Sequence, residues 1–442
     1  MNFEDKYQGS KWIKCDFHLH SPGVHTFKLP NGFNIENEED VEKLSELYVE
    51  ELKKANIKIG AITDYNIIRK IWFEKIRDKA KEKGIVILPG VELSIALTGG
   101  KYGIHILVIL DDDENFDIEG FNRFIHSLDK KPQEPLVTGR QHKEIDSKFE
   151  LEELIKKIRS NYNCLIIFAH PEDDDKGLLK SFSIKEAAKY LAAISPDALE
   201  YTSKESVYRL ISTGEIDKYT LLKIPIIENS DPKSLKEIGT KERDGKIRCT
   251  YLKISDYNLD AIRVALLEPF LRVRLYNSPE YNYTKITKLK ISGTTFLKDI
   301  EIDFSPELNT FIGGRGVGKS SIIEAIRYCL NLPYYSEEVE QRLSFIENVV
   351  GSGGEITLFI DKYLGNKKTS YTISRIFGKH PEIKDEQGVT HKIEPLNLFD
   401  KNKSPFLIGQ KELYFISQDE KFLLQLIDQF IGDKINNKQK EL

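Results

Sequence analysis

Cysteine is scarce in this sequence, and long apolar segments are missing. Only four cysteines occur in 442 residues, and no two of them form a C-x-x-C pair. This argues against a disulfide framework or a cysteine-based zinc site and fits the reducing cytoplasm. No apolar run reaches the roughly 18 residues of a membrane helix, and MNFEDKYQGSKW lacks the apolar core of a signal peptide. We therefore expect a cytoplasmic chain without a membrane span.

A strong net charge of either sign is also missing. The 65 Lys and Arg residues nearly balance the 70 Asp and Glu residues, which leaves a net charge of −5. Without a global basic field, any nucleic-acid surface must be a local patch. Two groups of basic residues are candidates for such a patch, although a solvated charged surface is the commoner explanation for each. These are Lys130, Lys131, Arg140 and Lys143 in one segment, and Lys285, Lys288 and Lys290 in another.

The first part of the chain alternates short apolar strands with helical patterns. Strands rich in Ile, Val and Leu between amphipathic helices predict a parallel sheet or a βα barrel, with chemistry at the carboxyl ends of the strands. The expected strands are Ile13–Phe17, Ile57–Thr63, Ile85–Leu88, Ile104–Leu110, Leu165–Ala169, Ala198–Tyr201 and Ile224–Ile227, and expected helices include Glu38–Ala55, Ile67–Lys83, Leu151–Arg159 and Ile184–Ala193.

Two polar segments interrupt this pattern. Residues 111–148 predict an inserted surface segment, and residues 276–283 predict a linker between domains 1–275 and 284–442. The second domain is expected to contain the strands Ile286–Ser292, Asp299–Phe304, Leu308–Ile312, Glu355–Tyr363 and Lys368–Phe377, a helix from Lys319 to about Asn331, and a helical or coiled-coil start at 422–442.

Residues 313–320, GGRGVGKS, match the phosphate-binding pattern G-x-x-x-x-G-K-[ST] between an apolar strand and a helix. The glycines let backbone N–H groups turn toward phosphates, and the helix N-terminus adds its dipole. Lys319 should reach the β- and γ-phosphates, and Ser320 should bind Mg²⁺. These flanks disfavour a chance match. The expected ATP and Mg²⁺ site comprises Gly313, Gly314, Arg315, Gly316, Val317, Gly318, Lys319, Ser320 and Ser321.

The stretch KLKISGTTFLKDIEIDFSPELNTFIGGRGVGKSSIIEAIRYCL resembles the N-terminal lobe of SMC, Rad50 and RecN-like ATPases. FLIGQKELYFIS is similar to their Q-loop, which would place Gln410, or alternatively Gln418, near Mg²⁺ or the attacking water. No LSGGQ-type signature is present, and Asp361 reads as an ordinary strand end rather than a Walker B residue. The resemblance implies a truncated or split ATPase, heads that dimerise around ATP, and a possible SMC-like partner.

Histidines and carboxylates recur at successive strands of the first domain. His18 and His20 in DFHLHS are two residues apart on an extended segment, so their side chains point the same way and can grip one metal. A single histidine is more often a satisfied core group, but a series of imidazoles and carboxylates predicts a metal site. The further members are Asp64, Glu92, His105, His170 and Asp231.

The pieces DFHLHS, AITDY, LPGVELS, IHILVI, FAHPE, ALEYT and ENSDPKSLKEIG resemble the PHP (polymerase and histidinol phosphatase) family over residues 11–274. The resemblance implies a distorted seven-stranded βα barrel that cleaves phosphoesters with two or three metals. His18, His20, Glu92 and Asp231 would hold one metal. Glu92 would bridge to a second, held by His105 and His170, and Asp64 would orient a ligand or a water.

Two departures concern the third metal of that family. Tyr65 and Lys233 stand where the family has histidines, and His25 alone cannot hold a metal. We therefore expect two metals, for which Zn²⁺, Mn²⁺ and Fe are all suited. Lys233 either occupies the vacated region and offsets phosphate charge, or is a solvated surface group.

The order of the two domains is similar to that of PHP-associated (TrlF-like) ATPases, which implies nucleic-acid processing or phage defence. We expect a metal-dependent nuclease, with DNA as the favoured substrate, governed by ATP-driven head closure. Two alternatives stay open. One is a small-molecule phosphatase with an ATP-sensing module, and the other is a catalytically inactive ATP-dependent scaffold.

Overall fold

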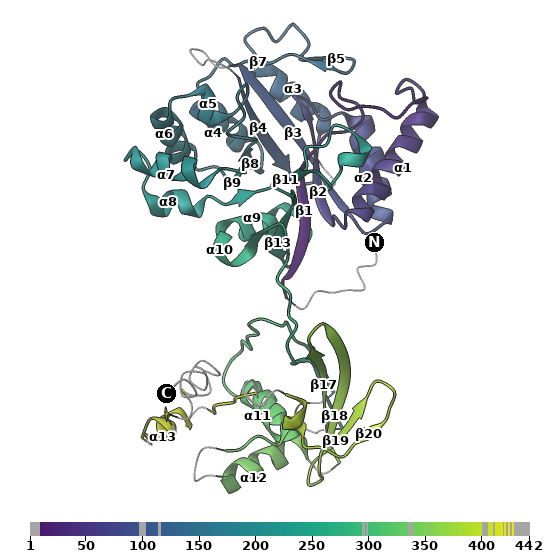
Figure 1. The fold of residues 1–442 in the computed structure, drawn as a ribbon, viewed down its shortest axis with the longest axis vertical. Coiled ribbons are helices and arrows are strands. Elements are labelled where there is room, and N and C mark those ends of the chain that lie inside the picture. The colour runs from purple at the N-terminus through teal and green to yellow at the C-terminus, as the bar shows by residue number, and fades with distance from the viewer. Residues whose placement is uncertain are drawn as a thin grey trace. The chain divides into compact units, whose positions relative to one another are not determined.

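The chain forms two compact units, Met1–Pro279 and Glu280–Leu442, in a computed structural model (Figure 1). Their division falls inside the polar segment 276–283. No helix among the described residues is long and apolar enough to cross a membrane. The structure describes residues 9–96, 103–113, 116–293, 297, 299–334, 339–351, 353–399, 405–409, 412–418, 420, 423–424 and 427.

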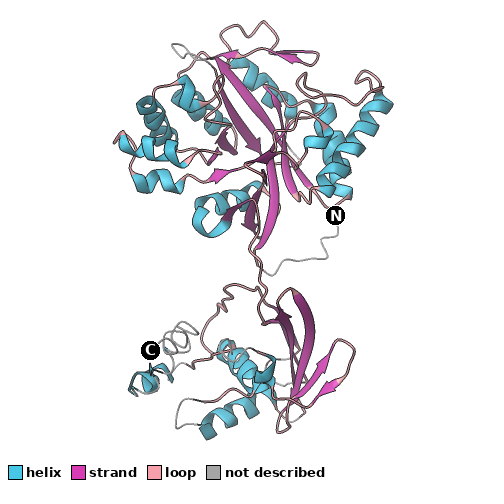
Figure 2. Cartoon of the chain, in the orientation of Figure 1, coloured by secondary structure: helices cyan, strands magenta, loops and turns pink. Residues whose placement is uncertain are grey.

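The first unit is built on one strongly curved sheet with helices around it (Figure 2). Its strand order is β10-β9-β8-β4-β3-β2-β1-β13-β14, and β7 also pairs with β3. The two ends of this path, β10 and β14, contact each other, so the expected distorted barrel is confirmed as a nearly closed one. The strands are β1 (Lys11–Leu19), β2 (Ile59–Tyr65), β3 (Val86–Ala96), β4 (Ile104–Leu110), β7 (Ile145–Asp146), β8 (Cys164–Phe168), β9 (Ala198–Glu200), β10 (Ile226–Ile227), β13 (Thr250–Ile254) and β14 (Val273–Leu275).

Of the two arrangements that the sequence predicts, a parallel sheet or a barrel, the parallel sheet is wrong for half of the strand pairs along this path. β1, β2 and β3 are parallel, as are β8, β9 and β10, but β4 runs antiparallel to both β3 and β8. β13 is antiparallel to β1 and β14. No helix stands between β3 and β4 in the described residues, and a short connection joins antiparallel strands. The reversal brings the start of β4 to the edge where its parallel neighbours end.

Helices cover the outside of this sheet because each has one apolar face. In α1 (Glu38–Lys54), Asn37 caps the first turn, and Leu44, Tyr48 and Leu52 are buried at four-residue spacing. One apolar core lies between helices and sheet, and a second, with Phe17, fills the inside of the sheet. The other helices are α2 (Lys70–Glu82), α3 (Ile118–Ser127), α4 (Leu151–Asn161), α5 (Leu178–Ser181), α6 (Ile184–Ile194), α7 (Lys204–Ser212), α8 (Lys218–Lys223), α9 (Leu259–Leu267) and α10 (Pro269–Arg272).

The inserted segment 111–148 is not merely a surface loop, which corrects the sequence prediction. Its first half forms α3, whose Phe121 and Ile125 are fully buried in the main core. Its second half contains β5 (Val137–Thr138), β6 (Gln141–His142) and β7, and packs on the loop after β1. There Arg140 donates to the carbonyl of Val24 at 2.5 Å. Apolar residues at helical spacing within the polar segment explain the error.

The second unit has an antiparallel sheet in the order β16-β15-β17-β18-β19-β20, with α11 against β17 and β18 and α12 against α11 (Figure 1). The strand expected at Leu308–Ile312 is absent. Leu308 and Ile312 are 85% and 94% exposed, because no described strand lies alongside to pair with this segment. The elements are β15 (Lys285–Ser292), β16 (Ile300–Asp303), α11 (Lys319–Leu330), α12 (Val339–Val350), β17 (Glu355–Leu364), β18 (Lys367–Ile376), β19 (Glu382–Asp385), β20 (Thr390–His391) and α13 (Glu412–Gln418).

Candidate metal centre and nucleotide loop

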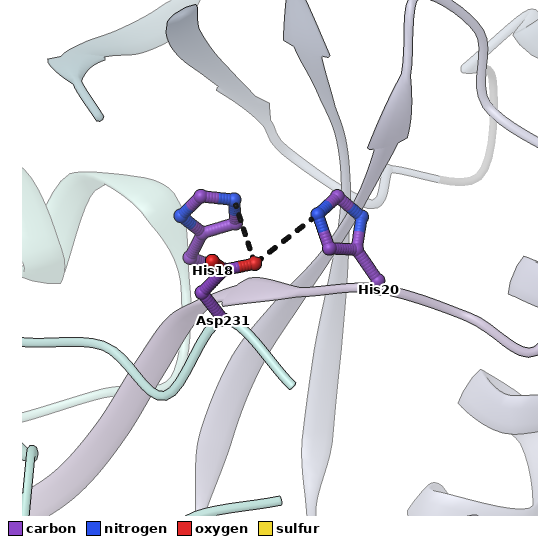
Figure 3. Close-up of side chains that lie close together, drawn as sticks. All are labelled: His18, His20 and Asp231. Atoms are coloured by element: carbon purple, nitrogen blue, oxygen red, sulfur yellow. Dashed lines mark ion pairs between the residues drawn. The ribbon is translucent and has the colours of Figure 1, made fainter. Parts of the chain in front are cut away.

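Three side chains converge just beyond the ends of β1 and β10. Asp231 Oδ1 lies 3.6 Å from Nε2 of His18 and 3.3 Å from Nε2 of His20 (Figure 3). Both histidines are fully buried. One imidazole nitrogen from each histidine and one carboxylate oxygen therefore face a common point, which is the arrangement that a divalent metal needs.

Glu92 lies at the centre of the site, between this group and a second one. Its Oε2 lies 3.1 Å from Nε2 of both His18 and His20. Its Oε1 lies 3.2 Å from Nε2 of His170 and is hydrogen-bonded to Nδ1 of His105. Each carboxylate oxygen thus faces a different histidine pair. The structure brings together all six ligands that the sequence predicts, in two groups joined by one carboxylate.

Several polar atoms at this point are buried and have no hydrogen-bond partner. Nε2 of His18, Nε2 of His20 and Oε2 of Glu92 make no hydrogen bond in the described structure. Burial alone would raise the pKa of the Glu92 carboxyl, but the imidazoles of His105 and His18 outweigh it and hold that pKa well below its usual range. A buried anion among imidazole nitrogens without partners fits divalent metal ions.

The backbone is unusual at two of these ligands. His170 and Asp231 have φ angles of +29° and +44°, a region that non-glycine residues rarely adopt. The pairing of β1 with β2 is also irregular between Asp16 and Leu19, the stretch that carries His18. Such strain and irregular pairing re-aim side chains and persist where the surrounding structure enforces them. Here they turn the ligands toward one centre.

Sequence reasoning missed the residue that orients His18. Glu200, at the end of β9, is buried, and its Oε1 lies 3.0 Å from Nδ1 of His18. It also accepts from the backbone N–H of His170 at 2.8 Å and from Asn229 at 2.8 Å. Burial would raise its pKa, but His18 outweighs burial and holds the pKa at about 2. Its position at the end of an expected strand, in ALEYT, was the available signal.

Asp64 lies behind the ligands rather than among them. Its carboxylate accepts from the backbone N–H of Ser21 at 2.8 Å and from the Ser21 hydroxyl at 2.6 Å. Its closest approach to a ligand is 3.9 Å, to Nδ1 of His20. It fixes the turn after β1, which is consistent with an orienting role and not with metal contact.

The two residues that stand in place of family histidines contact each other. Lys233 Nζ donates to Asp231 Oδ1 at 2.6 Å and to the Tyr65 hydroxyl at 3.2 Å. Burial would lower the Lys233 pKa, but Asp231 outweighs burial and raises that pKa, so the ammonium stays charged. Lys233 therefore lies at the centre and is not a freely solvated surface group.

The nucleotide loop is open and exposed. Gly316 and Gly318 have φ angles of +82° and +96°, which glycine adopts without strain, and α11 begins directly at Lys319. Lys319 Nζ donates to the carbonyls of Gly313 and Gly314 at 2.7 and 2.5 Å. Of the other candidates, Arg315, Val317 and Ser320 are exposed and Ser321 is buried.

The two Q-loop candidates, Gln410 and Gln418, lie in the sequence on either side of a residue that forms a buried ion pair. Gln410 lies outside the described residues, and Gln418 is exposed in α13. Between them, Glu412 is fully buried and accepts two hydrogen bonds from Arg327 on α11, at 2.7 and 2.6 Å. This bidentate pair attaches the segment next to Gln410 to the helix that follows the nucleotide loop.

The basic patches that the sequence suggests are largely neutralised. Lys130 pairs with Asp146 at 2.8 Å, and Lys143 pairs with Glu134 at 3.1 Å. Lys131 also lies near Glu134, and Arg140 donates to backbone carbonyls. In the second unit Lys288 pairs with Glu301, while Lys285 lies over the rings of Tyr281, Tyr283 and Tyr363.

Comparison with known proteins assigns the second unit. Residues 288–442 match the AAA domain family model. A DNA double-strand break repair Rad50 ATPase from Thermococcus kodakarensis is 30% identical over 172 residues, covering 36% of this chain and 19% of the relative. This chain thus spans about a fifth of the relative's length.

Two solved structures are similar to the first unit at low identity. One, from Bacteroides vulgatus, contains a predicted PHP-like metal-dependent phosphoesterase; it is 15% identical with a TM-score of 0.38 and covers 67% of this chain and 84% of that chain. The other is an amidohydrolase from Chromobacterium violaceum with bound sulfate, 14% identical with a TM-score of 0.34, covering 52% and 91%. Because these TM-scores are low, the support for the metal centre is the geometry of its own side chains. The expected resemblance of the C-terminal unit is confirmed: residues 288–442 match an AAA domain, and part of the chain is similar to a Rad50 ATPase.

Proposed function

We propose that the N-terminal unit is a metal-dependent phosphoesterase that holds two divalent metals. The central support is Glu92, a fully buried carboxylate whose two oxygens face two separate histidine pairs. Mixed imidazole and carboxylate ligands suit Mn²⁺ or Zn²⁺. One metal is held by His18, His20, Asp231 and Glu92, and the other by Glu92, His105 and His170.

Each nearby side chain has a defined part in this reaction. When bound, a pair of divalent metals lowers the pKa of a water between them and neutralises phosphate oxygens. Glu92 would provide one carboxylate oxygen to each metal, and Glu200 holds the ring of His18 in place. Lys233 brings a permanent positive charge next to Asp231 and Tyr65. Its ammonium offsets charge that develops on the phosphate in the transition state.

Nucleic acid, with DNA favoured, is the substrate that the second unit supports. That unit has the nucleotide loop of an AAA-type ATPase, and its relative is a DNA double-strand break repair ATPase. The chain is accordingly a nuclease whose activity depends on ATP and Mg²⁺ at Lys319 and Ser320. Rad50-like heads would dimerise around ATP, with a possible SMC-like partner chain. The PHP-associated resemblance favours a place in DNA processing or phage defence.

A substrate panel tests this function. The purified chain is incubated with Mn²⁺ or Zn²⁺ and with labelled single- and double-stranded DNA, RNA or a generic phosphomonoester. The His18→Ala/His20→Ala variant runs alongside, with His380→Ala, an exposed histidine of the second unit, as a control. Polymer cleavage that is lost only in the double variant supports a metal nuclease. Cleavage of the monoester alone would indicate a phosphatase, and no turnover by the metal-loaded wild type would contradict the proposal.

A further inference from the structure

A group of basic side chains surrounds the ring of Tyr65, on the side of the metal centre where the family histidines are missing. The ammonium groups of Lys233 and Lys176 lie 5.5 and 6.0 Å from the centre of this ring. The His142 ring stacks on it at 4.0 Å, and the His25 ring lies 5.2 Å from His142. We propose that Lys176 forms a subsite beside Lys233 that binds a second phosphate of the substrate, next to the phosphate that is cleaved.

Lys176 differs from Lys130, Lys143 and Lys233 because it has no acidic partner among the described residues. No carboxylate among the described residues lies within ion-pair distance of it, whereas Lys180 in the same region pairs with Asp174 at 2.7 Å. Its backbone is fixed at the centre, since its carbonyl accepts from the N–H of His105 at 3.1 Å. A half-buried ammonium held beside metal ligands without a counter-ion is available for an anion.

The rest of the subsite adds no negative charge of its own. Burial, followed by the charges of His25 and Lys176, lowers the pKa of His142 to about 3. Burial, followed by the charges of Arg140 and Lys176, also lowers the pKa of His25. Both rings are therefore uncharged, and they line the subsite without adding charge to it. Of the nearest carboxylates, Asp231 pairs with Lys233 at 2.6 Å and Glu92 faces the histidine ligands, so the uncompensated positive charge of this subsite is that of Lys176.

The inserted segment builds part of this subsite. His142 belongs to β6 of the insertion, and the carbonyl of Arg140 accepts from the backbone N–H of His25 at 3.0 Å. The His142 ring keeps Tyr65 in position, and Tyr65 in turn accepts from Lys233. The insertion thus contacts both Tyr65 and His25 on this side of the metal centre.

This subsite rests on the proposed function and narrows its substrate class. If the metal pair and Lys233 serve the phosphate that is cleaved, Lys176 selects substrates that carry a neighbouring phosphate. Nucleic-acid strands and nucleoside di- or triphosphates share that chemistry, whereas a simple monoester does not. Lys176 would then favour a strand or a polyphosphate over a lone phosphate group.

Equilibrium binding tests the subsite without relying on turnover. Inorganic pyrophosphate and orthophosphate are titrated calorimetrically into the Mn²⁺-loaded full chain carrying Lys319→Ala, so that the nucleotide loop contributes nothing. Adding Lys176→Gln should weaken pyrophosphate binding about tenfold, the loss expected for one charge-assisted hydrogen bond, and weaken orthophosphate binding much less. Lys180→Gln, which makes the same charge change nearby, should bind like its parent.

Two further ligands identify the source of the second phosphate. For a labelled single-stranded oligonucleotide, Lys176→Gln should lower the slope of log affinity against log salt by about 0.7, the value for one phosphate contact. A loss with ATP but not with the oligonucleotide would assign the subsite to nucleotides. Unchanged binding of pyrophosphate, oligonucleotide and ATP by Lys176→Gln would overturn the inference. If Lys176→Gln weakens binding but the wild type hydrolyses no phosphoester, the subsite is retained and the proposed function is rejected.

Discussion

Glu200 orients His18 through a 3.0 Å contact between its Oε1 and Nδ1 of the imidazole, and both side chains are fully enclosed. The other imidazole nitrogen, Nε2, faces Glu92 and Asp231. A carboxylate behind a ligating histidine fixes the ring and raises the basicity of its free nitrogen. Because Glu200 also accepts from the backbone of His170, it contacts residues of both ligand groups.

Replacing this carboxylate should weaken metal binding. We expect Glu200→Gln to lower the metal affinity about 10- to 100-fold, the range found when such supporting groups are lost. Competition with a chelator of known affinity measures the change. Glu205→Gln, an exposed residue of α7, serves as the matched control. Unchanged metal affinity in Glu200→Gln would mean that Glu200 serves only folding.

Lys233 should matter for catalysis and not for the number of metals. Lys233→Met removes a charge that lies 2.6 Å from Asp231. We expect about a hundredfold loss in kcat, similar to the loss of one transition-state hydrogen-bond donor elsewhere. Metal content should stay at that of the wild type. Lys236→Met, an exposed neighbour, controls for charge. If the kcat of Lys233→Met equals that of the wild type, Lys233 has no part in catalysis and is only a solvated group.

Most of the metal centre could be predicted because its ligands occur in short local patterns. His18 and His20 share one extended segment, and the other ligands are at or close to expected strands. Lys176 and His142 could not be found in the same way, since Lys176 lies in a turn and His142 in a two-residue strand, and only the folded chain brings them to Tyr65. The antiparallel β4 was missed because strand direction depends on connections that periodicity does not reveal.

The nucleotide loop should act independently of the metal centre in binding. Lys319→Ala removes the ammonium that now donates to Gly313 and Gly314 and that is placed to reach phosphates. We expect ATP affinity to fall by at least tenfold, measured with a fluorescent ATP analogue, while the metal content of the first unit is unchanged. Lys367→Ala, an exposed lysine of β18, is the control. Unaltered ATP binding would show that the loop does not hold phosphates.

The Arg327–Glu412 pair should stabilise the second unit. Arg327→Met leaves the Glu412 carboxylate buried without its bidentate partner, which costs about 3–5 kcal/mol. Lys384→Met breaks only a half-exposed pair with Glu382 and should cost less than about 1 kcal/mol.

Urea unfolding of the full chain separates these effects. Both tryptophans, Trp12 and Trp72, lie in the first unit, so their fluorescence transition should be the same in all variants. The transition that far-UV circular dichroism reports for the second unit should shift to lower urea in Arg327→Met. Equal shifts in Arg327→Met and Lys384→Met would contradict a special role for the buried pair.

The number of metals per chain tests the central claim most directly. The full chain is saturated with Mn²⁺ or Zn²⁺ in the absence of nucleotide, desalted and analysed by inductively coupled plasma mass spectrometry. We expect two metals per chain in the wild type and about one in His105→Ala, which keeps the group of His18, His20 and Asp231 intact. A wild-type chain that retains no metal, or a His105→Ala chain that retains as much as the wild type, would contradict the account.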